Sequence, residues 1–221
     1  MKKTFGKIFV IFWKDMLTEI RSREMIIPVL VFALLVLVIF SFAFGTGADT
    51  AAPGVLWVAL TFGGVTGLNR VFAVEKENSR MEGLMLCPVD RAVIYWGKVA
   101  GSFTFMLALA LVVTPIFLAL FNLPLFLPGL ALIIALALLG FAAVGTLFSA
   151  MAVNTRAREI LLPILFLPVV VPVIIAAVQA TGPVLAGMPW EEMVIYLQII
   201  TAFDIIYLVA ATLVFEFVIE E

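Results

Sequence analysis

Histidine is absent from this chain of 221 residues, and cysteine occurs once, at Cys87. Without histidine, the chain lacks the commonest metal ligand and general base in proteins. A single cysteine excludes a framework of internal disulfides. Charge is also scarce, because 13% of the residues are charged whereas 65% are hydrophobic. With a mean hydropathy of +1.25, the chain is more apolar than a soluble fold requires, and it is predicted to be a polytopic membrane protein.

Several sequence patterns that carry chemistry are also missing. There is no P-loop, so the chain cannot bind and hydrolyse ATP by that route. No Ser/His or Asp pair is available for intramembrane proteolysis, and no acid–base relay runs through the apolar stretches. No cluster of metal ligands occurs. These absences predict a membrane subunit that is not itself an enzyme and that depends on another subunit for energy.

The apolar stretches predict an all-α fold with six transmembrane helices. The charge-free stretch from Val99 to Thr155 is too long for one crossing, and turn signals at Asn122, Pro128 and Gly129 divide it into two. The whole chain, residues 1–221, is interpreted as a single membrane domain. The predicted spans lie at about residues 25–44, 50–68, 99–121, 129–153, 160–180 and 193–215.

Residues 1–24 place apolar side chains such as Phe5, Phe9 and Phe12 at helical spacing, with lysines and arginines elsewhere on the helical wheel. This pattern predicts an amphipathic helix that lies in the membrane interface. The alternative is a leader segment that only sets the orientation of the first span.

The distribution of positive charge predicts the orientation of the chain. With six spans, all 13 Lys and Arg residues fall on one side of the membrane or at its boundary. The positive-inside rule then places both termini and the two basic loops in the cytoplasm. The predicted location is the cytoplasmic (inner) membrane of a bacterium or archaeon.

The longest charged interruption is the loop at residues 75–98. Ser79 and Glu82 have the spacing of a capping box, so a short helix can start near Arg80, and Pro88 ends it. Asp90 can cap the next helix, which enters the membrane. A short cytoplasmic helix between two spans can be bound by a separate ATPase. The candidate coupling residues are Ser79, Arg80, Met81, Glu82, Leu84, Met85 and Pro88.

Asp204 is the only acidic residue well inside a predicted span. A carboxylate at that depth is costly to keep ionised, so it must face protein or water, or be protonated. It is a candidate functional site that contacts a substrate or couples movement. The alternative is a neutral acid that forms a hydrogen bond with a neighbouring helix.

Two other features concern helix shape and packing. Pro163, Pro168 and Pro172 lie within ten residues of the fifth span, which predicts a broken or strongly curved helix. These prolines are a candidate hinge, with a static kink as the alternative. Gly140 and Gly145, with alanines between them, predict a small-residue face for close helix packing in the fourth span.

Residues 54–99 resemble the CcmB family, haem exporter protein B of cytochrome c maturation. The shared features are a G-x-x-W opening of the second span, the pattern S-x-x-E-x-L-M-L-x-P from Ser79 to Pro88, and Gly97–Lys98 at the start of the third span. The proline pattern of residues 162–177 is similar to the fifth span of that family. Chain length and the number of spans also fit, so the resemblance covers essentially the whole chain.

The resemblance implies a permease of the ABC-2 type, in which two copies of this subunit pair with two copies of the ATP-binding subunit CcmA. It also implies association with CcmC, CcmD and the haem chaperone CcmE, within membrane lipid and without nucleic acid. No cofactor would bind this chain directly, because ATP belongs to the partner and haem is handled by the complex. The work would be haem export or the release of haem-loaded CcmE. Without histidine the chain offers no imidazole axial ligand to haem iron, which favours release.

Two other functions fit the same residues. An ABC-2 permease for a lipid, drug or glycan would carry a similar coupling helix without haem-handling neighbours. A structural membrane subunit without a transport cycle would not change ATPase stimulation when Glu82 or Leu84 is substituted.

Overall fold

The computed structural model describes residues 2–21, 26–44, 48–69, 90–153, 155 and 158–220. Within these ranges the chain is all-helical and has no strand, which confirms the predicted fold class. Six of the helices are long and apolar enough to cross a membrane. The helices are α1 (Lys2–Arg21), α2 (Ile26–Phe44), α3 (Ala48–Leu68), α6 (Arg91–Leu120), α7 (Pro128–Ala152), α8 (Arg158–Leu185) and α9 (Glu191–Glu220).

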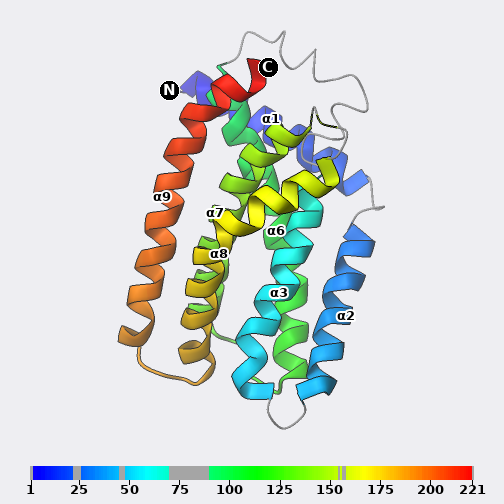
Figure 1. The fold of residues 1–221 in the computed structure, drawn as a ribbon, viewed down its shortest axis with the longest axis vertical. Helices are drawn as coiled ribbons and strands as arrows, with labels where there is room; N and C mark the ends of the chain where they lie inside the picture. The colour runs from blue at the N-terminus through cyan, green and yellow to red at the C-terminus, as the bar shows by residue number, and fades with distance from the viewer. Residues whose placement is uncertain are drawn as a thin grey trace.

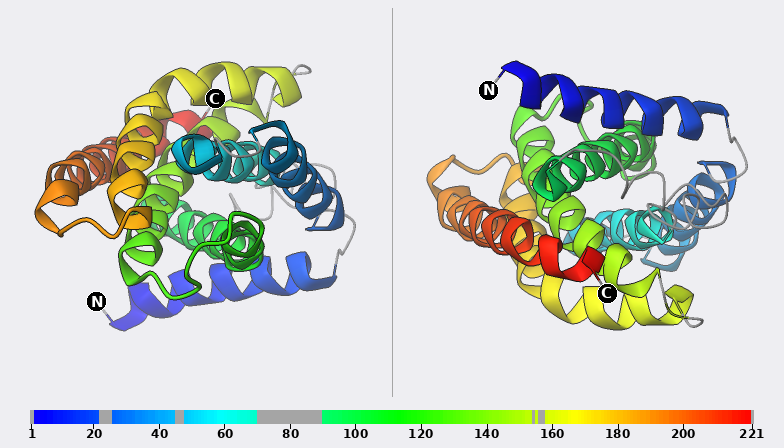
Figure 2. Two further views of the ribbon diagram at one scale, coloured as in Figure 1. Left: turned by 90° about the horizontal axis from the view of Figure 1, so that it is seen from below. Right: turned by 90° about the horizontal axis from the view of Figure 1, so that it is seen from above.

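The six long helices form one bundle, and α1 lies across one end of it (Figures 1 and 2). The ends of α1 and α9 that lead to the chain termini are at this same end. Helix α1 packs on α6 at Gly97, where a Cβ atom would lie 2.7 Å from Ile11 Cγ2. Phe9 and Trp13 of α1 remain exposed. A helix across the bundle end with exposed aromatic side chains is the arrangement that an interfacial helix requires.

Local signals in the sequence account for several helix ends. The Asp90 side chain accepts a hydrogen bond of 3.1 Å from the Ala92 backbone N–H, so Asp90 caps α6 as predicted. Asn122 follows α6 with a φ of 57°, a left-handed conformation that asparagine tolerates at turns.

Three helices extend beyond the stretches predicted as spans. Helix α6 begins at Arg91, directly after the predicted cap Asp90 and ahead of the span predicted from residue 99, α8 reaches Leu185, and α9 continues to Glu220. Apolar composition marks only the part of a helix that crosses hydrocarbon, whereas backbone hydrogen bonds carry the same helix on into the polar boundary.

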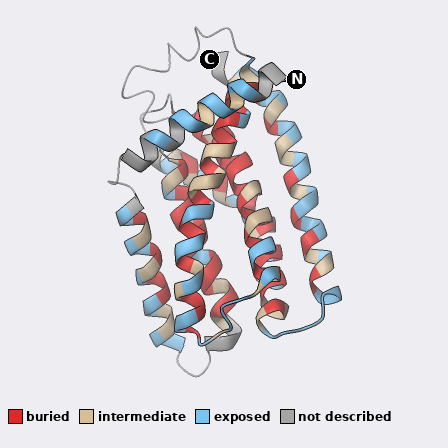
Figure 3. Ribbon diagram, turned by 180° about the vertical axis from the view of Figure 1, so that it is seen from behind, coloured by how far each residue is buried: buried red, intermediate tan, exposed pale blue. Residues whose placement is uncertain are grey.

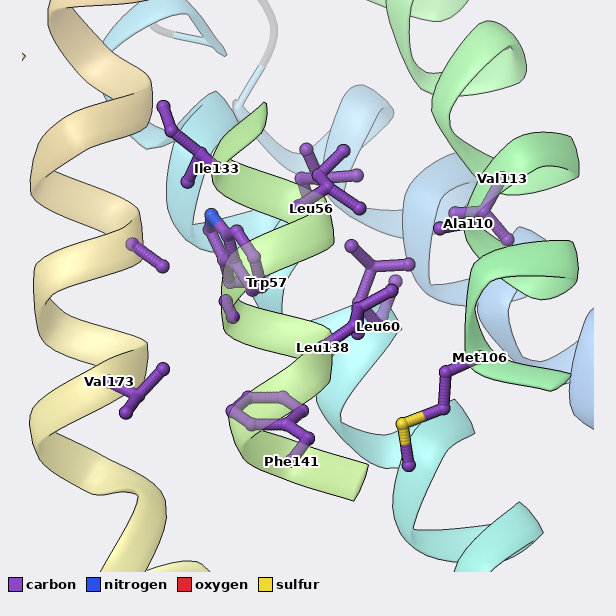
Figure 4. Close-up of a cluster of buried hydrophobic side chains, with 14 of the residues drawn as sticks. Leu56, Trp57, Leu60, Met106, Ala110, Val113, Ile133, Leu138, Phe141 and Val173 are labelled. Atoms are coloured by element: carbon purple, nitrogen blue, oxygen red, sulfur yellow. The ribbon is translucent and has the colours of Figure 1, made fainter. Parts of the chain in front are cut away.

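Helix α7 packs against α3, α6, α8 and α9, and the inner faces of the helices in the bundle are buried (Figure 3). Trp57, Phe141 and Phe166, from three different helices, form a row of edge contacts with ring centroids 6.4 and 5.6 Å apart. Figure 4 shows Trp57 and Phe141 within this apolar cluster. Aromatic pairs of this kind add about 0.5–1.5 kcal/mol each beyond the burial of their surface. The core therefore joins α3, α7 and α8.

Candidate functional site: a buried carboxylate beside a polar helix interface

Asp204 lies near the middle of α9 and is 3% exposed. Neither carboxyl oxygen has a hydrogen-bond partner. The structure therefore does not show the hydrogen bond to a neighbouring helix that the alternative interpretation of this residue requires. An unpaired polar group in such surroundings is costly, which makes Asp204 a candidate functional residue.

Gly140 of α7 makes room for the Asp204 carboxyl. A Cβ atom at Gly140 would overlap Asp204 Oδ1 and would lie 3.4 Å from a ring carbon of Phe203. The ring of Phe203 in turn stacks on Tyr207 one turn along α9, with centroids 4.2 Å apart. The carboxyl is thus held against the backbone of α7 because position 140 has no side chain.

The small residues of α7 do not form the single packing face that was predicted. Gly140 faces α9 at Asp204, whereas a Cβ atom at Gly145 would overlap the Leu68 side chain of α3. Five residues turn an α-helix through well over one revolution, so positions 140 and 145 point in different directions. Helix α7 therefore approaches two neighbours closely, one through each glycine.

Buried polar side chains line the contact between α6 and α7. The Tyr95 hydroxyl donates a hydrogen bond of 3.1 Å to the Ala143 carbonyl, and the hydroxyls of Ser102 and Thr146 are 3.2 Å apart. Lys98, between Tyr95 and Ser102 on α6, is also buried at 2% exposed. These contacts fix α6 against α7 beside the α9 contact.

Sequence reasoning missed this polar interface. The available signal was spacing, because Tyr95, Lys98 and Ser102 recur at intervals of three and four residues and therefore share one face of α6. Thr146 and Ser149 are three residues apart on α7, where Thr146 meets Ser102 of α6 and Ser149 bonds to the Leu68 carbonyl of α3. Such spacing in an otherwise apolar span indicates a helix–helix contact.

Helix α8 contains Pro163, Pro168, Pro172 and Pro183. It remains one helix but bends strongly, so that its first part (yellow) runs across the bundle end and its second part (gold) runs along the bundle (Figures 1 and 2). Each proline lacks a backbone N–H and its ring crowds the preceding turn, which bends the helix. The predicted curvature is present, whereas a complete break is not.

The predicted coupling residues Ser79, Arg80, Met81, Glu82, Leu84, Met85 and Pro88 lie outside the described residues. The structure does describe the two helix ends that flank them. Ser149 of α7 donates a hydrogen bond of 2.9 Å to the Leu68 carbonyl at the end of α3. At the start of α6, Arg91 donates one of 3.0 Å to the Glu216 carbonyl of α9. Helix α3 therefore ends at a point held by α7, and α6 begins at a point held by α9.

The bundle, its transverse N-terminal helix and its buried polar interface define a polytopic α-helical membrane protein. A family model described as CcmB protein matches residues 6–220 of the chain. The chain belongs to the CcmB family.

Curated relatives agree with this assignment. The chain is 28% identical to heme exporter protein B of Pseudomonas aeruginosa over 82% of this chain and 83% of the relative. It is 31% identical to heme exporter protein B of Paracoccus denitrificans, and 29% identical to that of Rhodobacter capsulatus, in each case over 78% of this chain and 81% of the relative.

Proposed function

We propose that this chain is the permease subunit of an ABC transporter complex for cytochrome c maturation. The observation that carries the proposal is the family match over residues 6–220, together with six helices able to span a membrane. The three relatives are each named heme exporter protein B. ATP hydrolysis takes place on a separate ATP-binding subunit, since this chain has no P-loop.

In this proposal the helix at Ser79–Pro88 docks into that ATP-binding subunit. Movement of the docked helix is transmitted to α3 at Leu68 and to α6 at Arg91. Leu68 is hydrogen-bonded to α7, and Arg91 is hydrogen-bonded to α9. ATP-driven closure of the partner would shift the spans between two packing states. The complex holds two copies each of this subunit and CcmA, with CcmC, CcmD and CcmE as neighbours.

The work done by the complex is haem export or the release of haem-loaded CcmE. The chain has no histidine, so it supplies no imidazole to haem iron. This absence favours mechanical release of the chaperone over carriage of haem through the spans. The subunit lies in the cytoplasmic membrane with both termini in the cytoplasm, as the positive charges indicate.

The test is a pull-down of the full chain from native membranes in a gentle detergent, with its partners identified by mass spectrometry. We expect an ATPase together with haem-handling membrane proteins. Recovery of an ATPase without haem-handling proteins would contradict the cytochrome c role and favour a permease for a lipid, drug or glycan. Failure to recover any ATPase, under conditions that preserve other transporter complexes, would overturn the permease proposal and favour a structural subunit.

Matched variants locate the docking surface. Glu82→Gln and Leu84→Ala should each weaken capture of the ATPase. Glu191→Gln and Leu125→Ala make the same chemical changes at exposed positions in α9 and the α6–α7 connector, at the opposite end of the bundle, and should leave capture unchanged. Equal loss in both pairs would mean that the variants act through folding.

A further inference from the structure

The contact between α7 and α9 buries a titratable carboxyl group that has no hydrogen-bond partner. The Asp204 carboxyl is buried against the Gly140 backbone, and neither oxygen receives a hydrogen bond. A carboxylate that is ionised requires donors or a counter-charge, because removal from water is costly. A neutral carboxylic acid avoids most of this cost. The geometry therefore constrains the protonation state of Asp204.

The charged and titratable groups on the surrounding helices do not supply a hydrogen bond to the Asp204 carboxyl. Helix α7 carries no ionisable side chain, and neither does α8 from Ile160 to Leu185. On α6, Tyr95 and Lys98 are buried, but neither forms a hydrogen bond with the Asp204 carboxyl. The Tyr95 hydroxyl donates to the Ala143 carbonyl instead.

On α9 itself, two tyrosines lie near Asp204, and the other acids, Glu191, Glu192, Glu216 and Glu220, lie toward the two ends of the helix. Tyr207 lies one turn away and stacks on Phe203, and Tyr196 lies two turns away toward the start of the helix. Glu191 and Glu192 in the first turn of α9 and Glu216 near its other end are exposed. None of them donates a hydrogen bond to Asp204.

We propose that Asp204 is a proton-binding site that links protonation to the α7–α9 contact. While the two helices pack through Gly140, the carboxyl is neutral and holds its proton. When the helices part, water reaches the carboxyl, the proton leaves to water, and the carboxylate is hydrated. Closing the contact takes one proton back. By linkage, a condition that favours the ionised form must also favour separation of the helices.

Gly140 is the positioning residue of this site, because a side chain there would occupy the space of the carboxyl oxygen. Gly182 of α8 supplies a matched control, since a Cβ atom added there would meet nothing within 4 Å. The proposal does not depend on the transported species or on the ATPase partner, and it can be tested on the isolated full chain.

The experiment is infrared spectroscopy of the purified chain in detergent at neutral pH. A protonated carboxylic acid has a carbonyl stretching band that a carboxylate lacks. We expect this band in the native protein and not in Asp204→Asn. If that variant does not fold, ¹³C labelling of the four aspartates of the native chain identifies an aspartic acid band by its isotope shift. Absence of a protonated aspartic acid band from the native protein would overturn the proposal.

The glycine variants test the link to packing. In Gly140→Ala the band should decrease severalfold while a carboxylate band grows, because the displaced carboxyl gains water. Gly182→Ala should retain the native band. If Gly140→Ala is folded by circular dichroism and keeps the full band, then protonation is independent of the α7–α9 contact and the proposal fails. If Gly140→Ala does not fold, the presence or absence of the protonated aspartic acid band in the native protein decides the proposal.

Discussion

At the scale of single residues, the helices of this bundle are held together by two kinds of contact. Some depend on a glycine that has no Cβ atom, and others depend on a single hydrogen-bonding group. Gly97, Gly140 and Gly145 each permit an approach that a methyl group would block. Buried hydroxyls and one indole supply hydrogen bonds between helices. Moving an apolar helix face from lipid to a protein contact changes the free energy little, because both surroundings are apolar. Close packing and interhelical hydrogen bonds therefore determine which helix faces associate.

The bond between Trp57 and Thr181 gives a prediction at this scale. The Trp57 indole N–H donates to the Thr181 hydroxyl over 3.0 Å, and both side chains are fully buried. In a double-mutant cycle with Trp57→Phe and Thr181→Val, we expect a coupling energy of about 0.6 kcal/mol, the average for interhelical hydrogen bonds in membranes, and at most about 1.7 kcal/mol. The measurement is the free energy of unfolding in mixed micelles. Additive single effects would show that the bond contributes nothing.

At the scale of elements, α8 differs most from an ideal helix. Its backbone stays helical from Arg158 to Leu185, although four prolines interrupt its hydrogen bonds. Pro168 and Pro172 lie on the exposed side of the bend. Neighbouring helices must satisfy or shield the carbonyls that these prolines leave without donors. The bend directs the first part of α8 across the bundle end, opposite α1 (Figure 2).

Removing the prolines should straighten α8. Spin labels at exposed positions Ile160 and Ile175, in a chain with Cys87→Ser, span the bend. In a straight helix fifteen residues cover about 22 Å, and a bent helix covers less. We expect Pro168→Ala combined with Pro172→Ala to lengthen the distance toward this value by pulsed electron resonance.

Pro183→Ala, outside the labelled segment, serves as the control and should leave the distance unchanged. An unchanged distance in the double variant would mean that packing, not proline, bends the helix. The same labels separate the hinge from the static kink. A hinge predicts that nucleotide shifts the distance in the assembled complex, whereas a static kink predicts one distance in both conditions.

At the scale of the whole molecule, six long helices place both ends of the chain at the same end of the bundle, together with the helix ends at Leu68 and Asp90 (Figure 1). The α6–α7 and α8–α9 connectors lie at the other end. The positive charges belong to the first end by sequence. The structure and the charge distribution therefore divide the chain into the same two sides.

This division predicts the outcome of reporter fusions. Green fluorescent protein fused after Glu221 should fluoresce, because that side is predicted to be cytoplasmic. Alkaline phosphatase inserted after Gly187, an exposed residue of the α8–α9 connector with a φ of 67°, should be active, because the enzyme needs the oxidising side to form its disulfides. Swapping the two reporters should silence both. Activity of a phosphatase fused at the C-terminus would contradict the predicted orientation and place that end of the bundle outside the cytoplasm.

Local chemistry and composition determined much of this protein from sequence alone. The number of long apolar helices follows from stretches without charge, the start of α6 from Asp90, and the turn after α6 from Asn122. The resemblance to CcmB rested on residue patterns and the family match confirms it. The curvature of α8 follows from proline chemistry. Each of these features depends on residues that are close together in the chain.

Only the tertiary structure decided which faces meet. Gly140 and Gly145 contact different helices, Asp204 is buried without a hydrogen bond, and Ser102 pairs with Thr146. These facts depend on the rotation and tilt of each helix relative to its neighbours. In a soluble helix a polar face reports that rotation, but in a membrane helix both the lipid face and the protein face are apolar. The sequence pattern therefore identifies the spans, whereas packing against neighbours determines which residues they bring together.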